Sequence, residues 1–358
     1  ERQAQSRTEG RSDRSQPGKA AWTKRIGRCH RRIATKACGR IGQIKQHAAQ
    51  PPAPSNAFDN PVDARHKADS ATSRNGRKSI MSQPPAIFDT TLVRRHLARR
   101  PGTADFVTDL VLADLADRLS ALFREFPRAA IIGPDIDKLP ASGQTASASF
   151  RFERHAAFSG DNDVPELEGD DFNLIVSLLH LQAVNDVPGY LARLRGRLAP
   201  DGLLLIAALG GETLTELREA YLAADTEIFG GAAARVAPMI QVRDAGALLQ
   251  RVGLALPVAD VETHVVRYAS PFALMAELKA LGAANPLADR PKKLATPALL
   301  AAAAEAYAAR DSDPDGRIRA TLEIIWLSGW APHESQQEPL KPGSATTRLR
   351  DVLGKTQE

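Results

Sequence analysis

Continuous apolar runs in the middle of the chain predict strands that are buried on both faces of a sheet. Residues 172–179 and 203–209 are almost wholly apolar or β-branched, which is the pattern of a central parallel strand. Between them, Tyr190, Leu191 and Leu194 recur at helical spacing. A strand, a helix and a second strand in this order form a unit with a right-handed crossover, so the pattern predicts two parallel neighbouring strands.

The flanking segments continue this alternation of helices and strands. Helices are predicted over residues 106–123, 243–252, 271–281 and 297–310, and further strands over 129–133, 147–152, 254–268 and 318–327. Alternating strands and helices of these lengths are typical of an α/β domain built on a mostly parallel sheet.

The charge of the chain divides at Met81, its first methionine. Of the 47 basic and 42 acidic residues, 18 basic and six acidic residues precede Met81, so the first 80 residues carry a net charge of +12 and the remainder carries −7. The basic balance therefore belongs to the N-terminal segment, and no nucleic-acid partner is expected for the part that follows. No apolar run reaches the ~18 residues of a transmembrane span.

The composition divides the chain into three parts. Residues 1–80 are rich in Arg, Ser, Gln and Pro and poor in large apolar side chains, which predicts disorder. Three explanations stay open for this segment: upstream sequence translated in error, an organellar presequence, or a basic arm that binds nucleic acid or membrane. A domain is expected over 81–340 and a tail over 341–358. Cys29 and Cys38 both lie in the first segment, so no thiolate metal site is expected in the domain, and no other metal site is predicted.

Several short motifs lie in the predicted loops and strand ends. The most specific is GGETLTELR over residues 210–218, and the other motifs are FNLIVS (172–177), VNDVP (184–188), PDG (200–202), VRDAGALL (242–249) and GWAPHESQ (329–336). Over residues 84–346 the chain resembles the class I S-adenosylmethionine-dependent methyltransferase-like family that includes the mitochondrial complex I assembly factor 5 and its bacterial relatives.

The resemblance implies a Rossmann-like class I methyltransferase fold whose last strand, around 318–327, is antiparallel. It implies S-adenosylmethionine as cofactor and a protein partner or substrate, such as a subunit of respiratory complex I. It also implies that the lead-in at 87–89 and the basic residues Arg94, Arg95, Arg99 and Arg100 form a helix over the cofactor site. A solvated basic helix face is the alternative for this segment.

The cofactor residues that the resemblance implies begin at Gly133. In the family a glycine-rich loop follows this first strand, because backbone must pass close to the cofactor. Here Pro134 and Asp135 follow, so only the first glycine of the motif is present. The interval from Gly133 to Phe172 is also shorter than in the family by about one helix–strand unit, and it contains no clear acidic residue for the ribose. The remaining cofactor candidates are Asp161 and Asp163, which could also be ordinary loop residues, and Leu179.

The substrate residues are predicted at the ends of the next two strands. Gln182 and Asn185 follow the strand at 172–179, although Asn185 and Asp186 also suit the N-terminal cap of the next helix. Thr213 and Glu216 have the spacing of a capping box. That arrangement explains neither the double glycine nor the arginine of the motif. The further substrate candidates are therefore Gly210, Gly211, Glu212 and Arg218.

Three functions are compatible with these residues. The first is a protein-modifying methyltransferase linked to complex I assembly, and the second is a non-catalytic assembly module that has lost the cofactor. The third, a methyltransferase for malonyl-carrier protein, shares the fold but not the GGETLTELR motif. The Ala- and Arg-rich composition predicts a bacterial cytoplasmic protein. A mitochondrial matrix location is the alternative if residues 1–80 are a presequence.

Overall fold

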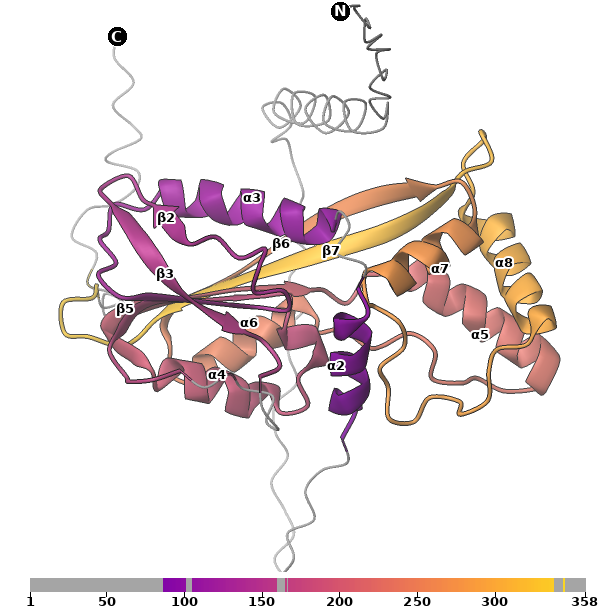
Figure 1. Ribbon diagram of the computed structural model, residues 1–358, viewed down its shortest axis with the longest axis horizontal. Coiled ribbons are helices and arrows are strands. Elements are labelled where there is room, and N and C mark those ends of the chain that lie inside the picture. The colour runs from indigo at the N-terminus through magenta and orange to yellow at the C-terminus, as the bar shows by residue number, and fades with distance from the viewer. Residues whose placement is uncertain (1–85, 101–104, 160–164, 166, 338–343, 345–358) are drawn as a thin grey trace, which may run out of the picture. The chain divides into compact units, whose positions relative to one another are not determined.

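A seven-stranded sheet in the order β2-β3-β1-β4-β5-β7-β6 forms the centre of the structure, a computed structural model (Figure 1). The strands are β1 (Ala129–Gly133), β2 (Ser142–Gln144), β3 (Ser149–Ala156), β4 (Phe172–Leu178), β5 (Leu198–Leu209), β6 (Ala255–Tyr268) and β7 (Ile318–Trp330). β3, β1, β4 and β5 are parallel, and β7 is antiparallel to both β5 and β6. The Rossmann-like fold with an antiparallel last strand is therefore confirmed.

The structure describes residues 86–100, 105–159, 165, 167–337 and 344. The described residues belong to one compact unit, Ile80–Glu358. The basic segment 1–80 and all of the tail 341–358 except Ser344 lie outside the described residues, so the predicted division of the chain stays a prediction.

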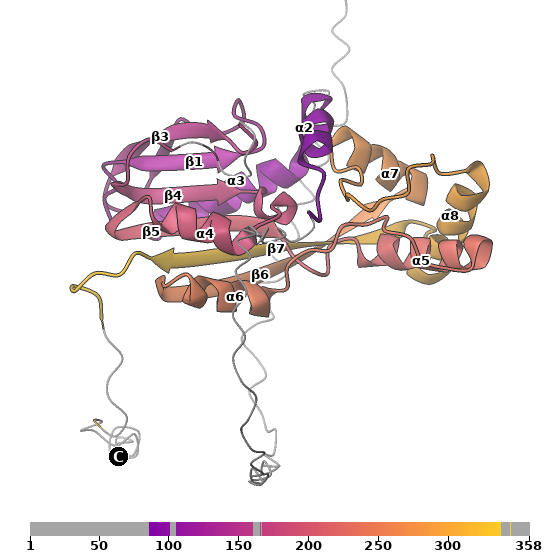
Figure 2. The ribbon, with the colours of Figure 1, turned by 90° about the horizontal axis from the view of Figure 1, so that it is seen from below.

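Helices cover both faces of the sheet (Figure 2). They are α2 (Thr90–Ala98), α3 (Phe106–Ser120), α4 (Val187–Arg195), α5 (Thr215–Phe229), α6 (Val242–Arg251), α7 (Pro271–Ala280), α8 (Pro297–Asp311) and the short 3-10 helix η1 (Leu181–Ala183). α3 packs on one face of the sheet, and α4 and α6 pack on the other. Asp186 caps α4 by accepting a hydrogen bond from the Gly189 N–H, as its position before Pro188 predicts.

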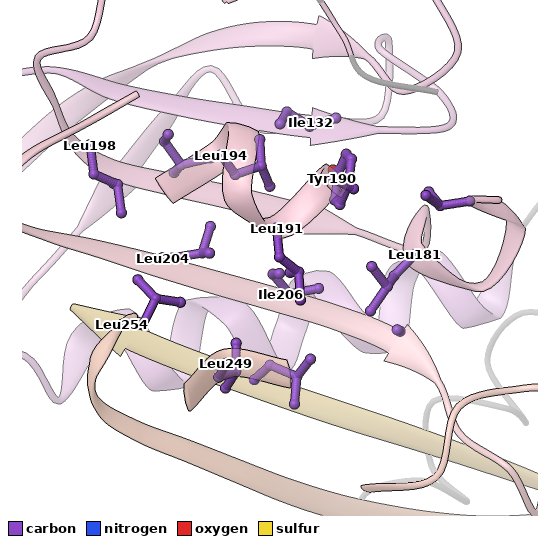
Figure 3. Packing of buried hydrophobic residues seen from close by; sticks show 14 of the residues in the cluster. Ile132, Leu181, Tyr190, Leu191, Leu194, Leu198, Leu204, Ile206, Leu249 and Leu254 are labelled. Carbon is purple, nitrogen blue, oxygen red and sulfur yellow. The ribbon is translucent and has the colours of Figure 1, made fainter. Parts of the chain in front are cut away.

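Alternate residues of the central strands pack into two separate cores. Ile132, Ile175 and Ile206 belong to the core under α4 and α6 (Figure 3), whereas Ile131 and Leu174 belong to the core under α3. Each of these side chains is completely buried, and burial of one such side chain contributes about 1.5–3 kcal/mol. This two-sided burial explains why the strands read as unbroken apolar runs in the sequence.

Beyond the end of β5, β7 is bordered by a turn instead of a strand. The Gly210 N–H donates to the Glu323 carbonyl at 2.9 Å, and the Leu214 N–H donates to the Thr321 carbonyl at 2.9 Å. Thr213 Oγ1 donates to the Glu323 carbonyl and accepts from the Glu323 N–H, and the Glu216 carboxylate accepts from Thr321. The predicted capping box is therefore wrong, since both side chains bind β7 and α5 begins after Leu214 without a side-chain cap.

The helices α5, α7 and α8 pack around the far end of β6 and β7, where Leu217, Leu274 and Tyr307 form a third apolar cluster. A buried ion pair ties α5 to the segment that follows it. Arg235 donates from Nε and Nη2 to the two carboxylate oxygens of Asp225, each at 2.6 Å, and the Asp225 side chain is 1% exposed. This two-point contact fixes the direction of residues 231–240.

Asn185 holds the chain that leads into α2. The Phe88 N–H donates to Asn185 Oδ1 at 2.8 Å, and Asn185 Nδ2 donates back to the Phe88 carbonyl at 3.1 Å. Asp89 then caps α2 by accepting from the Leu92 N–H, which lowers the pKa of its carboxyl. The predicted helix in the basic lead-in is confirmed. Its start is held by Asn185, which lies 97 positions after Phe88 in the sequence.

Replacement of Asp225 by alanine should destabilise the protein by about 3–5 kcal/mol, because Arg235 then stays buried without its partner. Equilibrium unfolding in urea measures this loss. Glu219→Ala is the matched control, since Glu219 also lies in α5 and forms an exposed ion pair with Arg310. Its loss should lower the free energy of unfolding by at most about 1 kcal/mol. Equal losses for the two variants would contradict the role given to the buried pair.

Replacement of Asn185 by alanine should release α2 while the sheet stays folded. Loss of two partly buried hydrogen bonds costs about 1–3 kcal/mol, so amide exchange in residues 88–98 should accelerate more than ten-fold. Hydrogen-exchange mass spectrometry of that segment is the measurement. Asp186→Ala removes the cap of α4 instead and should leave exchange in α2 unchanged; unaltered exchange in Asn185→Ala would refute the assignment.

Candidate functional site

A cavity of about 590 Å³ lies at the carboxyl ends of β1, β4 and β5. Pro134, Leu179 and Leu209, which end or follow these strands, line one side, and residues of α2, α5 and α7 line the others. In open α/β sheets, ligands bind outside the carboxyl ends of the parallel strands. A cavity of this size at this edge is therefore the candidate functional site.

The structure brings two of the predicted site residues to this cavity. Leu179 and Gln182 line it, and Gln182 Nε2 donates to the Leu179 carbonyl at 2.8 Å while its Oε1 is buried without a partner. The predicted residues that do not line the cavity are Gly133, Asp135, Asn185, Gly210, Gly211, Glu212 and Arg218. Asp161 and Asp163 lie outside the described residues.

The loop after β1 is filled by the chain's own side chains. A Cβ atom added to Gly133 would lie 2.7 Å from Leu139 Cδ2, and Leu139 is buried. Pro134 contributes no backbone N–H, and the residues between β1 and β2 form turns instead of the helix expected after a glycine-rich loop. The predicted shortening of this interval therefore corresponds to a missing helix.

Among the described residues, none at the carboxyl end of β3 provides a carboxylate. β3 is parallel to β1 and pairs Ala156 with Gly133, and Ala157 and Phe158 follow. This is the position from which a carboxylate would accept hydrogen bonds from both ribose hydroxyls. Together with the space that Leu139 occupies, these residues do not form a cradle for the methionine and ribose parts of S-adenosylmethionine.

The segment after β4 is a packed aromatic cluster. The His180 ring makes edge contacts with Phe158 and Tyr190, and His180 and Tyr190 are completely buried. Tyr190 Oη and Ser177 Oγ are hydrogen bonded at 2.7 Å, and burial raises the pKa of Tyr190 well above its usual range. The phenol therefore stays protonated, and the burial of His180 between two aromatic rings indicates a structural role for this side chain.

The double glycine makes room for two side chains of the protein. A Cβ on Gly210 would lie 2.1 Å from Glu323 Oε1, and a Cβ on Gly211 would lie 2.0 Å from Gln241 Nε2. Arg218 donates to the carbonyls of Gly211 and Thr213 and thereby stabilises the same turn. This packing accounts for both glycines and for Arg218 without a ligand, whereas Glu212 is exposed.

The site also contains polar residues that the sequence did not single out as ligand-binding. His96, Arg100 and Asp105 line the cavity, and Arg100 Nη1 donates to Asp105 Oδ2 at 3.2 Å. Burial lowers the pKa of His96, so its imidazole is neutral at pH 7. The basic run in the sequence indicated a helix beside the site. Which of its side chains face the cavity could be determined only from the position of α2 in the structure.

The described part of the chain contains neither a metal-binding cluster nor a membrane-spanning helix. There, no group of three or more His, Cys, Asp and Glu side chains is arranged to hold a metal ion. Among the same residues, no helix has the length and apolar character that a bilayer crossing requires.

The chain is similar in sequence to known proteins over most of its length. It is 33% identical over 310 residues to the mitochondrial arginine-hydroxylase NDUFAF5 of Rattus norvegicus, covering 78% of this chain and 90% of the relative. It is 33% identical over 290 residues to the human protein of the same name, covering 75% and 84%. A malonyl-[acyl-carrier protein] O-methyltransferase of Halorhodospira halophila is 38% identical over 161 residues, covering 45% of this chain and 52% of that protein.

No protein-family model matches the chain. Among solved structures, a putative methyltransferase from Bacillus halodurans is similar with a TM-score of 0.39 and 10% identity, covering 62% of this chain and 99% of the other. By its sequence identity to the NDUFAF5 proteins, the chain belongs to the NDUFAF5 family of class I S-adenosylmethionine-dependent methyltransferase-like proteins.

Proposed function

We propose that this protein serves the assembly of respiratory complex I by acting on one of its protein subunits. The observation that carries the proposal is the likeness to the NDUFAF5 proteins, which extends over about four fifths of this chain and nearly all of the rat relative. The cavity at the carboxyl edge is the place where we expect this action to be centred. The cofactor that family membership implies is S-adenosylmethionine.

The relatives' name points to an arginine side chain as the group that is modified. A buried guanidinium requires a carboxylate partner. Asp105 is the one carboxylate on the described cavity wall, and Arg100 already binds it. An arginine of the partner would therefore have to replace Arg100 at Asp105.

A second candidate is an assembly module that binds the subunit without using the cofactor. It is favoured by the β1 loop, where Leu139 occupies the space beside Gly133 and Pro134 lacks an N–H. Methyl transfer needs mainly alignment of the cofactor with its acceptor, so a chain that cannot hold the cofactor keeps only the binding role.

We also propose the division into a basic segment 1–80, a methyltransferase-like domain 81–340 and a tail 341–358. The bacterial cytoplasm is the proposed location. The relatives are mitochondrial by name, and a matrix location is the alternative if residues 1–80 are a presequence.

Deletion of the gene in its own organism should reduce assembled complex I several-fold, and the wild-type gene should restore it. Native gel electrophoresis and NADH:ubiquinone oxidoreductase activity are the measurements, with succinate dehydrogenase as the control that stays constant. A deletion strain with the normal amount of active complex I would exclude the assembly role.

Titration of the purified full-length chain with S-adenosylmethionine and S-adenosylhomocysteine separates the two candidates. Saturable binding in the micromolar range supports a modifying enzyme with an unusual loop. Absence of binding at millimolar ligand, in a sample that unfolds cooperatively, supports the binding module.

A further inference from the structure

Among the described lining residues, the exposed ones lie where α2 and α7 end. Of the residues that line the cavity, only Arg99, Lys279 and Ala283 are exposed, and the others are buried or partly buried. Arg99 follows the last residue of α2, and Lys279 lies in the last turn of α7. The exposed lining residues mark the mouth, so the mouth lies where these two helices end.

The two helix ends are in direct contact. A Cβ atom added to Gly282, just after α7, would lie 3.1 Å from Arg100 Nε and 3.1 Å from the His96 carbonyl oxygen at the end of α2. The basic side chains of the two helices therefore belong to one short rim.

Most of the rim's positive charge has no carboxylate partner. Arg100 binds Asp105 through Nη1, but its Nε is buried without a hydrogen-bond partner. Within the described residues, neither Arg99 nor Lys279 forms an ion pair. The other arginine of the lining, Arg235, is fully used by Asp225. The mouth thus offers N–H donors and positive charge to a ligand, and an anionic group forms the strongest hydrogen bonds with them.

Behind this rim the wall is apolar. Leu217, Leu274 and Leu322 are buried lining residues, and Met275 and Tyr268 border the same space. Methionine adapts to irregular apolar ligands. Burial of Tyr268 raises its pKa far above the usual range, so the phenol adds no negative charge at neutral pH.

We propose that this cavity binds a linear aliphatic carboxylate, with the hydrocarbon chain inside and the carboxylate at Arg99, Arg100 and Lys279. A cationic ligand finds no uncommitted carboxylate on the described wall, and a wholly polar ligand would leave the apolar interior unfilled. The ligand would occupy the same cavity on which the proposed role in complex I assembly is centred. Its binding is nevertheless tested without the subunit and without S-adenosylmethionine, so the outcome does not depend on that role.

Basic residues at helix C-termini also have a second explanation, because they interact favourably with the helix dipole. Arg95 provides the matched control. It lies in the last turn of α2 and is exposed, but it does not line the cavity. Charge reversal at Arg95 therefore alters the dipole interaction and the net charge without altering the mouth.

The test is calorimetric titration of the full-length protein with octanoate, decanoate and dodecanoate below their micelle concentrations. Each added methylene should raise the affinity roughly four-fold, since one buried methylene contributes about 0.8 kcal/mol. Dodecanol, which has the same chain length without the charge, should bind more weakly than dodecanoate.

The double variant Arg99→Glu with Lys279→Glu should weaken dodecanoate binding about ten-fold and remove the preference for dodecanoate over dodecanol. Arg95→Glu should change neither quantity. Circular dichroism melts establish that each variant is folded, and the chain-length series and the dodecanol comparison need no variant.

The proposal is overturned if the wild-type protein binds none of the carboxylates, if affinity is independent of chain length, or if Arg95→Glu weakens binding as much as the double variant. None of these results bears on complex I assembly, so the two proposals can fail separately.

Discussion

The long antiparallel strand β7 is the constraint on which the rest of the structure depends. Its residues 324–330 pair with β5, and almost its whole length pairs with β6. Where β5 ends, the turn at 210–214 takes its place, and Thr213 and Glu216 bind the main chain of β7. β7 therefore connects the parallel sheet to the end of the molecule where α5, α7 and α8 pack. Of these helices, α5 and α7 contribute residues to the cavity wall.

Two regions of the carboxyl edge of the sheet, one at β1 and β3 and the other at β5, are both filled by side chains of the protein itself. At β1 and β3 the space next to Gly133 is occupied by Leu139, and no helix follows the loop. At β5 the double glycine admits the side chains of Glu323 and Gln241, which lock the turn against β7 and the start of α6. The volume that remains open lies between these regions and is closed by α2. The open volume of this methyltransferase-like sheet thus lies at its carboxyl edge, next to α2 and α7.

Local patterns in the sequence predicted six of the seven described strands, and the short edge strand β2 was not predicted. Strands such as 172–179 are buried on both faces, so their apolar runs are unbroken in the sequence. Asp186 before Pro188 predicts the start of α4. The site was less predictable because its contacts join distant residues. Asn185 pairs with Phe88 across 97 positions, and Thr213 pairs with Glu323 across 110. Nothing in GGETLTELR itself indicates that its glycines admit side chains from two other elements, so a motif that resembled a ligand site is explained by internal packing.

The position of α2 determines which of its side chains the cavity presents to a ligand. α2 begins where Asn185 and Asp89 fix it, and it ends at the rim where Gly282 contacts Arg100. Its buried residues Leu92 and Val93 hold it on the protein, while Arg99 stays in solvent. One helix thus carries both the exposed charge of Arg99 and the buried apolar side chains. Movement of α2 would therefore change the mouth and the wall of the cavity together. A ligand that contacts both would therefore stabilise α2 in the position that the structure shows, and binding would be coupled to the Asn185–Phe88 contact.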